Sequence, residues 1–315
     1  MGRIAVLFPG QGVQKVGMGR DLLEAYPEVR ALFTTAGEVI GRDLLQLCLS
    51  GPEDALTVTY HAQPAILTVC IAYWHVLRSY TTLTPDFVAG HSLGEYTALV
   101  AADALRFEDG VRLVYYRGRY MQEAVPVGTG TMAAVIGLGE DTVARICASI
   151  ARPEYWVGPA NWNAPDQIVI AGHTAAVREA AEQCRAAGAR RVVFLQVSAP
   201  FHTPLVRPAE ERLAAHIDAV GWQPLRIPWM NNVTAEPVTD PETARAILKR
   251  QMTAPVQWTR LIRRLRELGV TTFVEVGPGR VLTGLVRRIV QDAECMAIHH
   301  VAALQDAMQR WPKTE

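Results

Sequence analysis

The sequence predicts an α/β protein built around a parallel sheet with helices on both faces. Short apolar segments of strand composition alternate with longer segments of helical periodicity along most of the 315 residues. This alternation is typical of a parallel sheet, because each crossover helix must pack on a face of that sheet. Half of the residues are hydrophobic, enough to bury one large domain, or a large domain that carries a smaller one.

The N-terminal part begins with a strand and a glycine-rich loop. RIAVLF (3–8) is the first expected strand, and PGQGVQKVGMG follows it as the loop. PAILTVCIAYWHVL (64–77) has the length and spacing of a helix. DFVAG (86–90) is a short strand that leads to a serine, and LGEYTALVAADAL then continues as a helix.

The composition changes between about 125 and 198, where we expect a small α+β insertion. The expected strands are MAAVIGL, DQIVIAG and RRVVFLQV. Helices are expected from VRLVYYRGRYMQ, just before the first of these strands, and from AAVREAAEQCRAAG. Residues 1–124 and 199–315 then form the larger subdomain, and 125–198 the smaller one.

After the insertion, the alternation of helices and strands resumes and completes the parallel sheet. The expected elements are a helix near 207–219, the strand IPWMNN, a helix near 242–251, the helix WTRLIRRLRELG, the strand TTFVEVG and a closing helix from VLTGLVRRIV.

Charge and cysteine content exclude several classes of partner and site. Lys plus Arg and Asp plus Glu both number 31, so no net charge attracts nucleic acid or an anionic membrane. No stretch approaches the roughly 18 apolar residues of a membrane span, and the first residues do not resemble a secretory signal. The cysteines form no CxxC pair, so we expect buried thiols in a cytoplasmic protein, without a disulfide framework or a zinc site. They are Cys48, Cys70, Cys147, Cys184 and Cys295.

The segment GHSLG (90–94) has the G-x-S-x-G spacing of a nucleophile elbow. Between a strand and a helix, such a turn lifts the hydroxyl of Ser92 clear of the sheet. Glycine is expected at 90 and 94, because a side chain there would collide with the tight turn or the packed helix. Alternatively, Ser92 only caps the helix, with Glu95 completing a capping box. The two interpretations are compatible, since an elbow serine lies at a helix N-terminus.

A serine nucleophile needs a base and donors for an oxyanion. Of eight histidines, His202 has the most suggestive position, in a proline-flanked loop after the strand VVFLQV. His91 is expected to pack or to shape the pocket, because neighbouring side chains at an elbow diverge. The backbone N–H groups of Leu93 and of Gln11, in the PGQG loop, are candidate oxyanion donors. Taken alone, PGQG is typical of an ordinary turn.

Arg117 is the residue most informative about substrate. With Val114 and Met121 it has i, i+3, i+7 spacing, which places an arginine beside an apolar stripe. A guanidinium pairs bidentately with a carboxylate, so a buried Arg117 would select acyl groups that end in one. A snorkelling arginine or an internal salt bridge would explain the pattern equally well.

A series of sequence blocks occurs in order along nearly the whole chain. The blocks are FPGQG, GHSLGEY, RGRYMQEAVPVGTGTMAAVIGL, NAPDQIVIAG, SAPFH, NNVTA, QMTAPVQW and EVGPGRVLTGL. In order and spacing they resemble malonyl-CoA:acyl carrier protein transacylases and the related acyltransferases of polyketide synthases. The resemblance implies an α/β-hydrolase-like large subdomain with a parallel sheet core and an inserted ferredoxin-like small subdomain.

The resemblance also implies roles for individual residues. Ser92 resembles the acyl-accepting nucleophile, His202 its base, and Gln251 the residue whose carbonyl orients the histidine. Gln11 and Leu93 resemble the oxyanion hole. In the implied ping-pong chemistry, the serine takes malonyl from coenzyme A, the CoA thiol leaves with a proton from the histidine, and the phosphopantetheine thiol of a carrier protein attacks the ester. No metal or bound cofactor is implied.

The acyl group implied by the resemblance is malonyl. Arg117 resembles the arginine that grips the free carboxylate of malonate. Phe201 resembles the bulky residue of malonyl-selective polyketide acyltransferases, in which a serine accompanies methylmalonyl; its ring would crowd an α-methyl branch. Met121 and Met132 are expected to line the acyl pocket, although methionine is also ordinary core filling. Val13 replaces a common serine and has no assigned role.

The partner implied is an acyl carrier protein, which in this family is an acidic helical bundle, so basic patches are candidate docking surfaces. A solvated helix face also explains the arginines on predicted helices. No exposed apolar helix requires a dimer, and we expect a monomer. The basic candidates are Arg260, Arg263, Arg264 and Arg266, then Arg287 and Arg288, and finally Arg190 and Arg191.

Two other classes of function remain open. A thioester hydrolase that clears stalled acyl groups from carriers would use the same Ser92 and His202. Arg117 argues against it, because a neutral acyl chain gives a buried cation no partner. A non-catalytic carrier-binding protein would not need the intact set of serine, histidine and oxyanion loop. The resemblance covers transferases of fatty acid and of polyketide synthesis alike, and methylmalonyl is the alternative acyl group.

Overall fold

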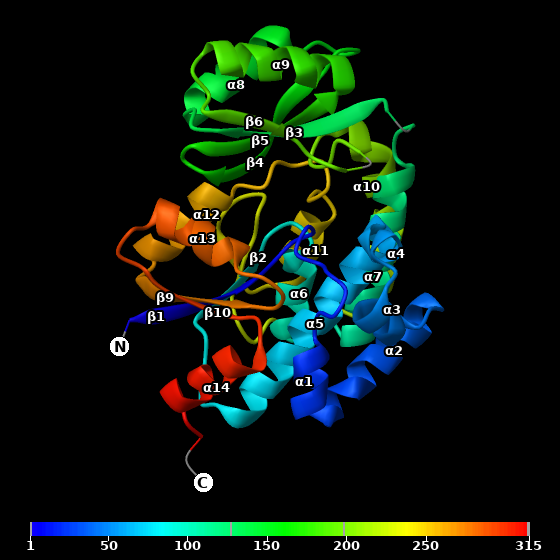
Figure 1. Ribbon diagram of the computed structural model, residues 1–315, viewed down its shortest axis with the longest axis vertical. Coiled ribbons are helices and arrows are strands. Elements are labelled where there is room, and N and C mark those ends of the chain that lie inside the picture. The colour runs from blue at the N-terminus through cyan, green and yellow to red at the C-terminus, as the bar shows by residue number, and fades with distance from the viewer. Residues whose placement is uncertain (1, 127, 198, 314–315) are drawn as a thin grey trace.

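The computed structural model describes residues 2–126, 128–197 and 199–313 and contains two separate sheets (Figure 1). The larger sheet has the strand order β10-β9-β1-β2-β7-β8 and is parallel except for β8, which runs antiparallel to β7. Its strands are β1 (Arg3–Phe8), β2 (Phe87–Gly90), β7 (Trp229–Met230), β8 (Pro237–Val238), β9 (Val270–Val276) and β10 (Glu294–Ile298).

Helices cover both faces of the larger sheet, because successive residues of its strands point to opposite sides. In β1, Val6 and Phe8 pack in one core cluster with residues of α5 (Thr59–Tyr80) and α6 (Gly94–Ala101). Ala5 and Leu7 pack in the other with α12 (Trp258–Glu267) and α13 (Val281–Ile289). The predicted parallel sheet between two helical layers is therefore confirmed.

The second sheet lies above the larger one in Figure 1, with both of its helices on the outer face. Its strand order is β4-β5-β3-β6 and all of its pairs are antiparallel. The chain order βαββαβ with this pairing is the ferredoxin-like arrangement. Its elements are β3 (Gly130–Ile136), α8 (Glu140–Ile150), β4 (Val157–Ala164), β5 (Gln167–His173), α9 (Thr174–Ala186) and β6 (Arg191–Phe194).

The remaining helices pack around the larger sheet and its connections. They are α1 (Arg20–Ala25), η1 (Pro27–Val29), α2 (Arg30–Ile40), α3 (Leu44–Ser50), α4 (Glu53–Thr57), α7 (Phe107–Glu123), η2 (Pro204–Val206), α10 (Arg207–Ala219), α11 (Pro241–Leu248) and α14 (Val301–Arg310).

The structure corrects several expectations. The helix from VLTGLVRRIV does not close the fold, because β10 and α14 follow it. The expectation also omitted α8, β4 and the helices α1 to α4, most of which are short. β4 contains glycine, proline and asparagine, which have low strand propensity, and its pairing with β5 is interrupted by register shifts. Cys295 is only partly buried, unlike the other four cysteines, and all five are free.

Within the described residues, no helix is long and apolar enough to cross a membrane. No group of three or more His, Cys, Asp or Glu side chains in this part of the chain is arranged to hold a metal ion.

The elbow between β2 and α6 depends on its two glycines. Ser92 has a φ of 53°, in the left-handed region that L-residues rarely occupy. A Cβ added to Gly90 would lie 1.9 Å from the carbonyl carbon of Gly94, and one added to Gly94 would lie 2.1 Å from the carbonyl oxygen of Phe8. Both distances are far inside van der Waals contact, so the expected need for glycine at these positions is confirmed.

Replacing Gly94 by alanine should therefore destabilise the protein. We expect Gly94→Ala to lower the free energy of unfolding by about 1–3 kcal/mol, because the new methyl group meets backbone atoms that cannot rotate away. Gly284→Ala is the matched control: Gly284 lies in the exposed face of α13 with no atom within 4 Å of an added Cβ. That change should raise stability by up to about 1 kcal/mol. Urea unfolding of both variants checks this, and equal stability of the two would contradict it.

Candidate active site

Ser92 and His202 form a hydrogen-bonded pair at the carboxyl end of the larger sheet. The elbow presents the Ser92 hydroxyl, and the loop after β6 supplies His202, whose φ of 60° also lies in the left-handed region. Ser92 Oγ lies 2.7 Å from His202 Nε2. The histidine is only 3% exposed. The 2.7 Å between Ser92 Oγ and His202 Nε2 is a distance at which an imidazole can take a proton from a hydroxyl.

Two backbone carbonyls orient His202. Its Nδ1 lies 3.2 Å from the carbonyl oxygen of Gln251 and 3.0 Å from that of Ala254. Carbonyl oxygens accept hydrogen bonds, so Nδ1 carries the proton and Nε2 is left as the acceptor that faces Ser92. The structure thus brings the predicted Gln251 carbonyl to the histidine and adds a second one, from Ala254, that the sequence blocks did not single out.

The capping interpretation of Ser92 is wrong. Helix α6 has no side-chain cap, and the Ser92 hydroxyl bonds to His202 and Arg117 instead. The capping box is not formed either, because the Ser92 N–H and the Glu95 carboxyl group, which would bond to each other in it, both bond to Asn232. Asn232 Oδ1 accepts from the Ser92 N–H at 2.8 Å, and Glu95 Oε1 accepts from the Asn232 N–H at 2.7 Å. Tertiary partners have replaced the local ones.

Arg117 projects from α7 into the same site and is 1% exposed. Its Nη2 donates to Ser92 Oγ at 2.9 Å and to Gln251 Oε1 at 3.0 Å, and its Nη1 donates to Gln63 Oε1 at 2.9 Å. Among the described residues, its guanidinium forms no salt bridge with a carboxylate. Neither the snorkelling arginine nor the internal salt bridge fits this environment.

The buried carboxyl group of Glu95 does not neutralise Arg117. Burial raises the pKa of Glu95 to about 8, against smaller opposing effects of its hydrogen bonds and of Arg117. Glu95 is therefore largely protonated at neutral pH. Burial also lowers the pKa of Arg117, although not enough to discharge a guanidinium. The site holds a buried positive charge that lacks a protein counter-ion in the described part of the chain.

The electrostatics keep His202 neutral. Burial is the main reason that its pKa falls to about 3, and the positive charge of Arg117 and the proximity of His91 act in the same direction. A histidine with this pKa is unprotonated throughout the physiological range, which is the state a general base requires.

A cavity of about 340 Å³ opens over these groups between the two sheets. His91 and Ser92 come from the elbow after β2 and Arg117 from α7, and the smaller sheet contributes Met132 and Asn161. His91 Nε2 also contacts Asn163 Oδ1 of β4 at 2.7 Å, which ties the elbow to the second sheet. The full lining is Gln11, Gly12, Gln14, Thr57, His91, Ser92, Arg117, Met121, Met132, Asn161, Leu195, Gln196, Val197, Phe201 and His202.

The remaining predicted residues lie at or next to this cavity. Gln11, Phe201, Met121 and Met132 line it. The Leu93 side chain is buried elsewhere, so only its backbone can face the site. In the described part of the chain, the Leu93 N–H donates to no protein acceptor, and neither does the Gln11 N–H. Both remain available to an oxyanion.

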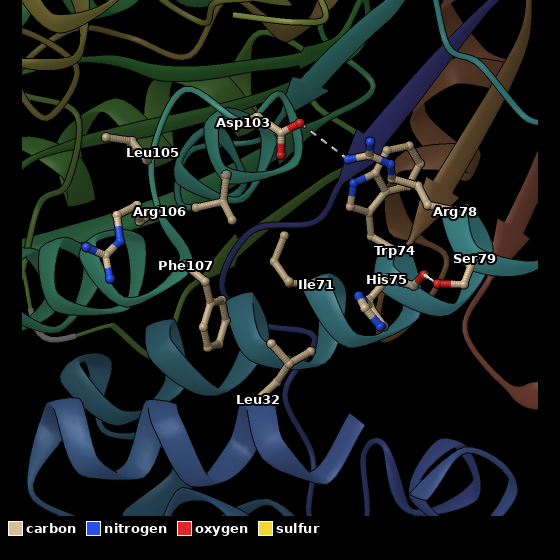
Figure 2. Close-up of a pocket in the computed structure, with 11 residues that line it drawn as sticks. Leu32, Ile71, Trp74, His75, Arg78, Ser79, Asp103, Leu105, Arg106 and Phe107 are labelled. Carbon is tan, nitrogen blue, oxygen red and sulfur yellow. Dashed lines mark hydrogen bonds and ion pairs between the residues drawn. The ribbon is translucent and has the colours of Figure 1, made fainter. Parts of the chain in front are cut away.

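A larger pocket of about 490 Å³ lies away from this chemistry, among α2, α5 and the start of α7 (Figure 2). It contains a histidine and a serine, His75 and Ser79, but Ser79 Oγ donates to the His75 backbone carbonyl at 2.9 Å. Arg78 points to Asp103, with 3.6 Å between Nη1 and Oδ2 (Figure 2). Among the described residues that line this pocket, no hydroxyl donates to a histidine ring.

Acidic neighbours offset most of the basic candidates on α12 and α13. Arg260 and Arg264 pair with Glu236, Arg266 with Asp292, and Arg288 with Asp166. This pattern favours the solvated helix face over a docking surface. Arg190 and Arg191 are exposed on the second sheet.

Sequence reasoning missed several polar side chains of the site, among them Gln63, Asn232 and the cavity-lining Asn161. Gln63 is fully buried, as a lone amide in an apolar helical run, and that contrast was the available signal. Asn232 belongs to the block NNVTA, which was singled out without a role.

The elbow serine and the buried histidine beside a cavity are the arrangement of an acyl-transferring enzyme, and the comparisons agree. The family model described as an acyl transferase domain matches residues 6–310, and the chain belongs to that family.

Its relatives include enzymes named malonyl CoA-acyl carrier protein transacylase. The chain is 44% identical to the one from Salmonella typhimurium over 308 residues, which cover 98% of this chain and 99% of that protein. It is 41% identical to the one from Bacillus subtilis over 309 residues, covering 98% and 97%. Among solved structures, a malonyl-transacylase in complex with a type II PKS acyl-carrier protein matches with a TM-score of 0.95 at 42% identity, covering 98% and 99%. The resemblance and the fold class inferred from the sequence blocks are therefore confirmed.

The buried neutral histidine makes stability depend on pH. His202 has an ordinary pKa of 6.5 when unfolded and about 3 when folded, so the unfolded chain binds the proton more readily between these values. Stability from this group is complete above pH 6.5 and is lost as the pH falls toward 3, by about 2 kcal/mol between pH 7 and pH 5. In the wild type this loss is offset by Glu95, whose raised pKa makes stability rise as the pH falls through the same range, so urea unfolding at both pH values has to be compared between the wild type and a His202 variant.

A variant isolates the histidine from Glu95, whose raised pKa gives the opposite slope between pH 4.5 and 8. In His202→Gln, the change in unfolding free energy between pH 7 and pH 5 should differ from that of the wild type by about 2 kcal/mol. Identical pH slopes in the two proteins would show that His202 is not held neutral.

Proposed function

We propose that this protein transfers malonyl from malonyl-CoA to the phosphopantetheine thiol of an acyl carrier protein, through an ester on Ser92. The observation that carries the proposal is the buried Arg117 guanidinium, which contacts the Ser92 hydroxyl and has no counter-ion among the described residues. Such a cation favours an acyl group that brings its own carboxylate. The names of the relatives support malonyl as this group and the carrier protein as the acceptor.

The first half-reaction forms the acyl-enzyme. His202 Nε2 takes the proton of the Ser92 hydroxyl while Oγ attacks the thioester carbonyl carbon. The negative charge that develops on the carbonyl oxygen is met by the N–H groups of Leu93 and Gln11. As the C–S bond breaks, the CoA sulfur leaves with the proton from Nε2. The carbonyls of Gln251 and Ala254 hold the ring in place and stabilise the transient imidazolium through Nδ1–H.

The second half-reaction is the reverse with a different thiol. His202 Nε2 takes the proton of the phosphopantetheine thiol, the sulfur attacks the ester carbon, and Ser92 Oγ leaves with that proton. The sum of the two steps exchanges one thioester for another, so no metal or redox cofactor is required. The same oxyanion donors serve both steps.

Arg117 sets the acyl preference. A malonyl carboxylate would replace Gln63, Ser92 and Gln251 as acceptors of the Arg117 N–H groups, with the bidentate geometry that a guanidinium prefers. A neutral acyl chain would leave the buried cation without a counter-charge. This disfavours the hydrolase of neutral acyl groups. Phe201, 7% exposed on the cavity wall, supports malonyl over methylmalonyl because its ring would crowd an α-methyl branch.

The two subdomains are proposed to divide at the predicted boundaries. Residues 1–124 and 199–315 form the large one and 125–198 the small one; residue 198 itself lies outside the described residues. The proposal is supported by the placement of all four strands of the second sheet between Gly130 and Phe194. We place the protein in the cytoplasm, in keeping with its five free thiols.

Intact-mass spectrometry tests the transfer. We expect the protein to gain one malonyl group from malonyl-CoA and little from acetyl-CoA, and to lose it when a phosphopantetheinylated carrier protein is added. Ser92→Ala should gain none. Ser79→Ala is the matched control, because Ser79 also lies beside a histidine but donates to a backbone carbonyl, and it should be acylated like the wild type.

Two results would contradict the proposal. One is the absence of an adduct from malonyl-CoA. The other is an adduct that is discharged to water equally fast with and without the carrier protein, which would indicate a hydrolase.

A further inference from the structure

The strained elbow is tied down by one side chain from a distant part of the sequence. Asn232 follows β7, which pairs with β2, and it is 1% exposed. Its Oδ1 accepts from the Ser92 N–H at 2.8 Å, and its Nδ2 donates to the carbonyl oxygen of Gly90 at 2.8 Å. A single carboxamide therefore bridges the end of the strand and the apex of the turn.

The backbone of Asn232 extends these ties to the helix and to the loop that orients the base. Its N–H donates to Glu95 Oε1 in α6 at 2.7 Å, and its carbonyl oxygen accepts from the Gln257 N–H at 2.9 Å. Gln257 ends the segment that carries the carbonyls of Gln251 and Ala254. Asn232 is thus connected to the strand, the apex and the helix of the elbow, and to the loop behind His202.

The chemistry of these bonds requires asparagine. The Ser92 N–H is a donor and the Gly90 carbonyl an acceptor, so only a side chain with one acceptor and one donor at this spacing satisfies both. An ionised aspartate would have no donor for Gly90, and an alanine would leave both backbone groups unpaired in a buried site.

We propose that Asn232 is a positioning residue that holds Ser92 in its left-handed conformation with the hydroxyl facing His202, an inference that rests on the proposed role of Ser92. Because the Ser92 N–H already donates to Asn232 Oδ1, the Leu93 N–H is the donor of the elbow that remains for the oxyanion. Asn232 is not among the described residues that line the cavity. It acts on the reaction through the position of Ser92.

The test compares Asn232→Ala and Asn232→Asp with Asn231→Ala. Asn231 is the matched control, because it is equally buried and also makes several hydrogen bonds, but all of them lie within the turn from 231 to 236. Three quantities are measured: the thermal unfolding midpoint, kcat and KM for malonyl transfer, and the rate at which a fluorophosphonate labels Ser92. In that labelling, Ser92 Oγ forms a bond to phosphorus as fluoride leaves.

We expect Asn232→Ala to lower kcat and the labelling rate by about 100-fold, with KM for malonyl-CoA nearly unchanged, because a small misplacement of a reacting atom has effects of this size. Asn231→Ala should lower the unfolding midpoint and keep kcat. In Asn232→Asp, activity relative to the wild type should rise as the pH falls from 8 to 5, because a protonated carboxyl can donate to Gly90 and accept from Ser92 as asparagine does. This recovery of activity at low pH tests the positioning role of Asn232 even if the alanine variant does not fold.

The inference is overturned if folded Asn232→Ala keeps kcat and the labelling rate, or if it raises KM alone. It is also overturned if Asn231→Ala loses as much kcat, or if Asn232→Asp shows no recovery at low pH. Failure of the proposed function has a different signature: the wild type would react with the fluorophosphonate and accept no malonyl from CoA. The labelling rates of the variants would then still decide whether Asn232 positions Ser92.

Discussion

The site is organised around a buried positive charge. Arg117 lies in the interior, and in the described part of the chain its N–H groups donate to neutral acceptors, the amides of Gln63 and Gln251 and the hydroxyl of Ser92. Removing a guanidinium from water without a counter-ion costs several kcal/mol, which the rest of the fold must offset. Glu95 does not supply that counter-ion, because burial raises its pKa to about 8. In the proposed function, the carboxylate of the malonyl group supplies the counter-ion of Arg117.

The same charge connects substrate choice to the reacting groups. Arg117 donates to Ser92 Oγ directly, and its charge adds to the effect of burial, which is the main reason that the pKa of His202 is low. The fold brings these residues together from separate elements. Parallel strands end at one edge of the sheet, where the elbow after β2 meets Asn232 after β7 and the loop that carries His202. The second sheet closes the cavity over this edge.

The sequence was most informative where function depends on local geometry. The spacing of GHSLG predicts the elbow, and helical periodicity places Arg117 beside an apolar stripe. It was least informative where partners are distant in the chain. The capping box at Ser92 failed because Asn232, 140 residues away, bonds to Ser92 instead. The Ala254 carbonyl behind His202 has no side-chain signature at all, since any residue could supply it. Strand β4 is defined by pairing rather than by propensity, and a periodicity argument overlooks it.

The most direct test of the central claim is the discrimination between malonyl-CoA and acetyl-CoA, measured as the ratio of their kcat/KM values. In Arg117→Ala this ratio should fall by about 100-fold or more, because the charge-assisted hydrogen bonds to the free carboxylate are lost only for malonyl. Arg119→Ala, which removes an exposed arginine of the same helix paired with Glu123, should leave the ratio unchanged. If kcat/KM instead fell by the same factor for both substrates in Arg117→Ala, Arg117 would act only through Ser92. The proposal that Arg117 binds the carboxylate of the substrate would then be wrong.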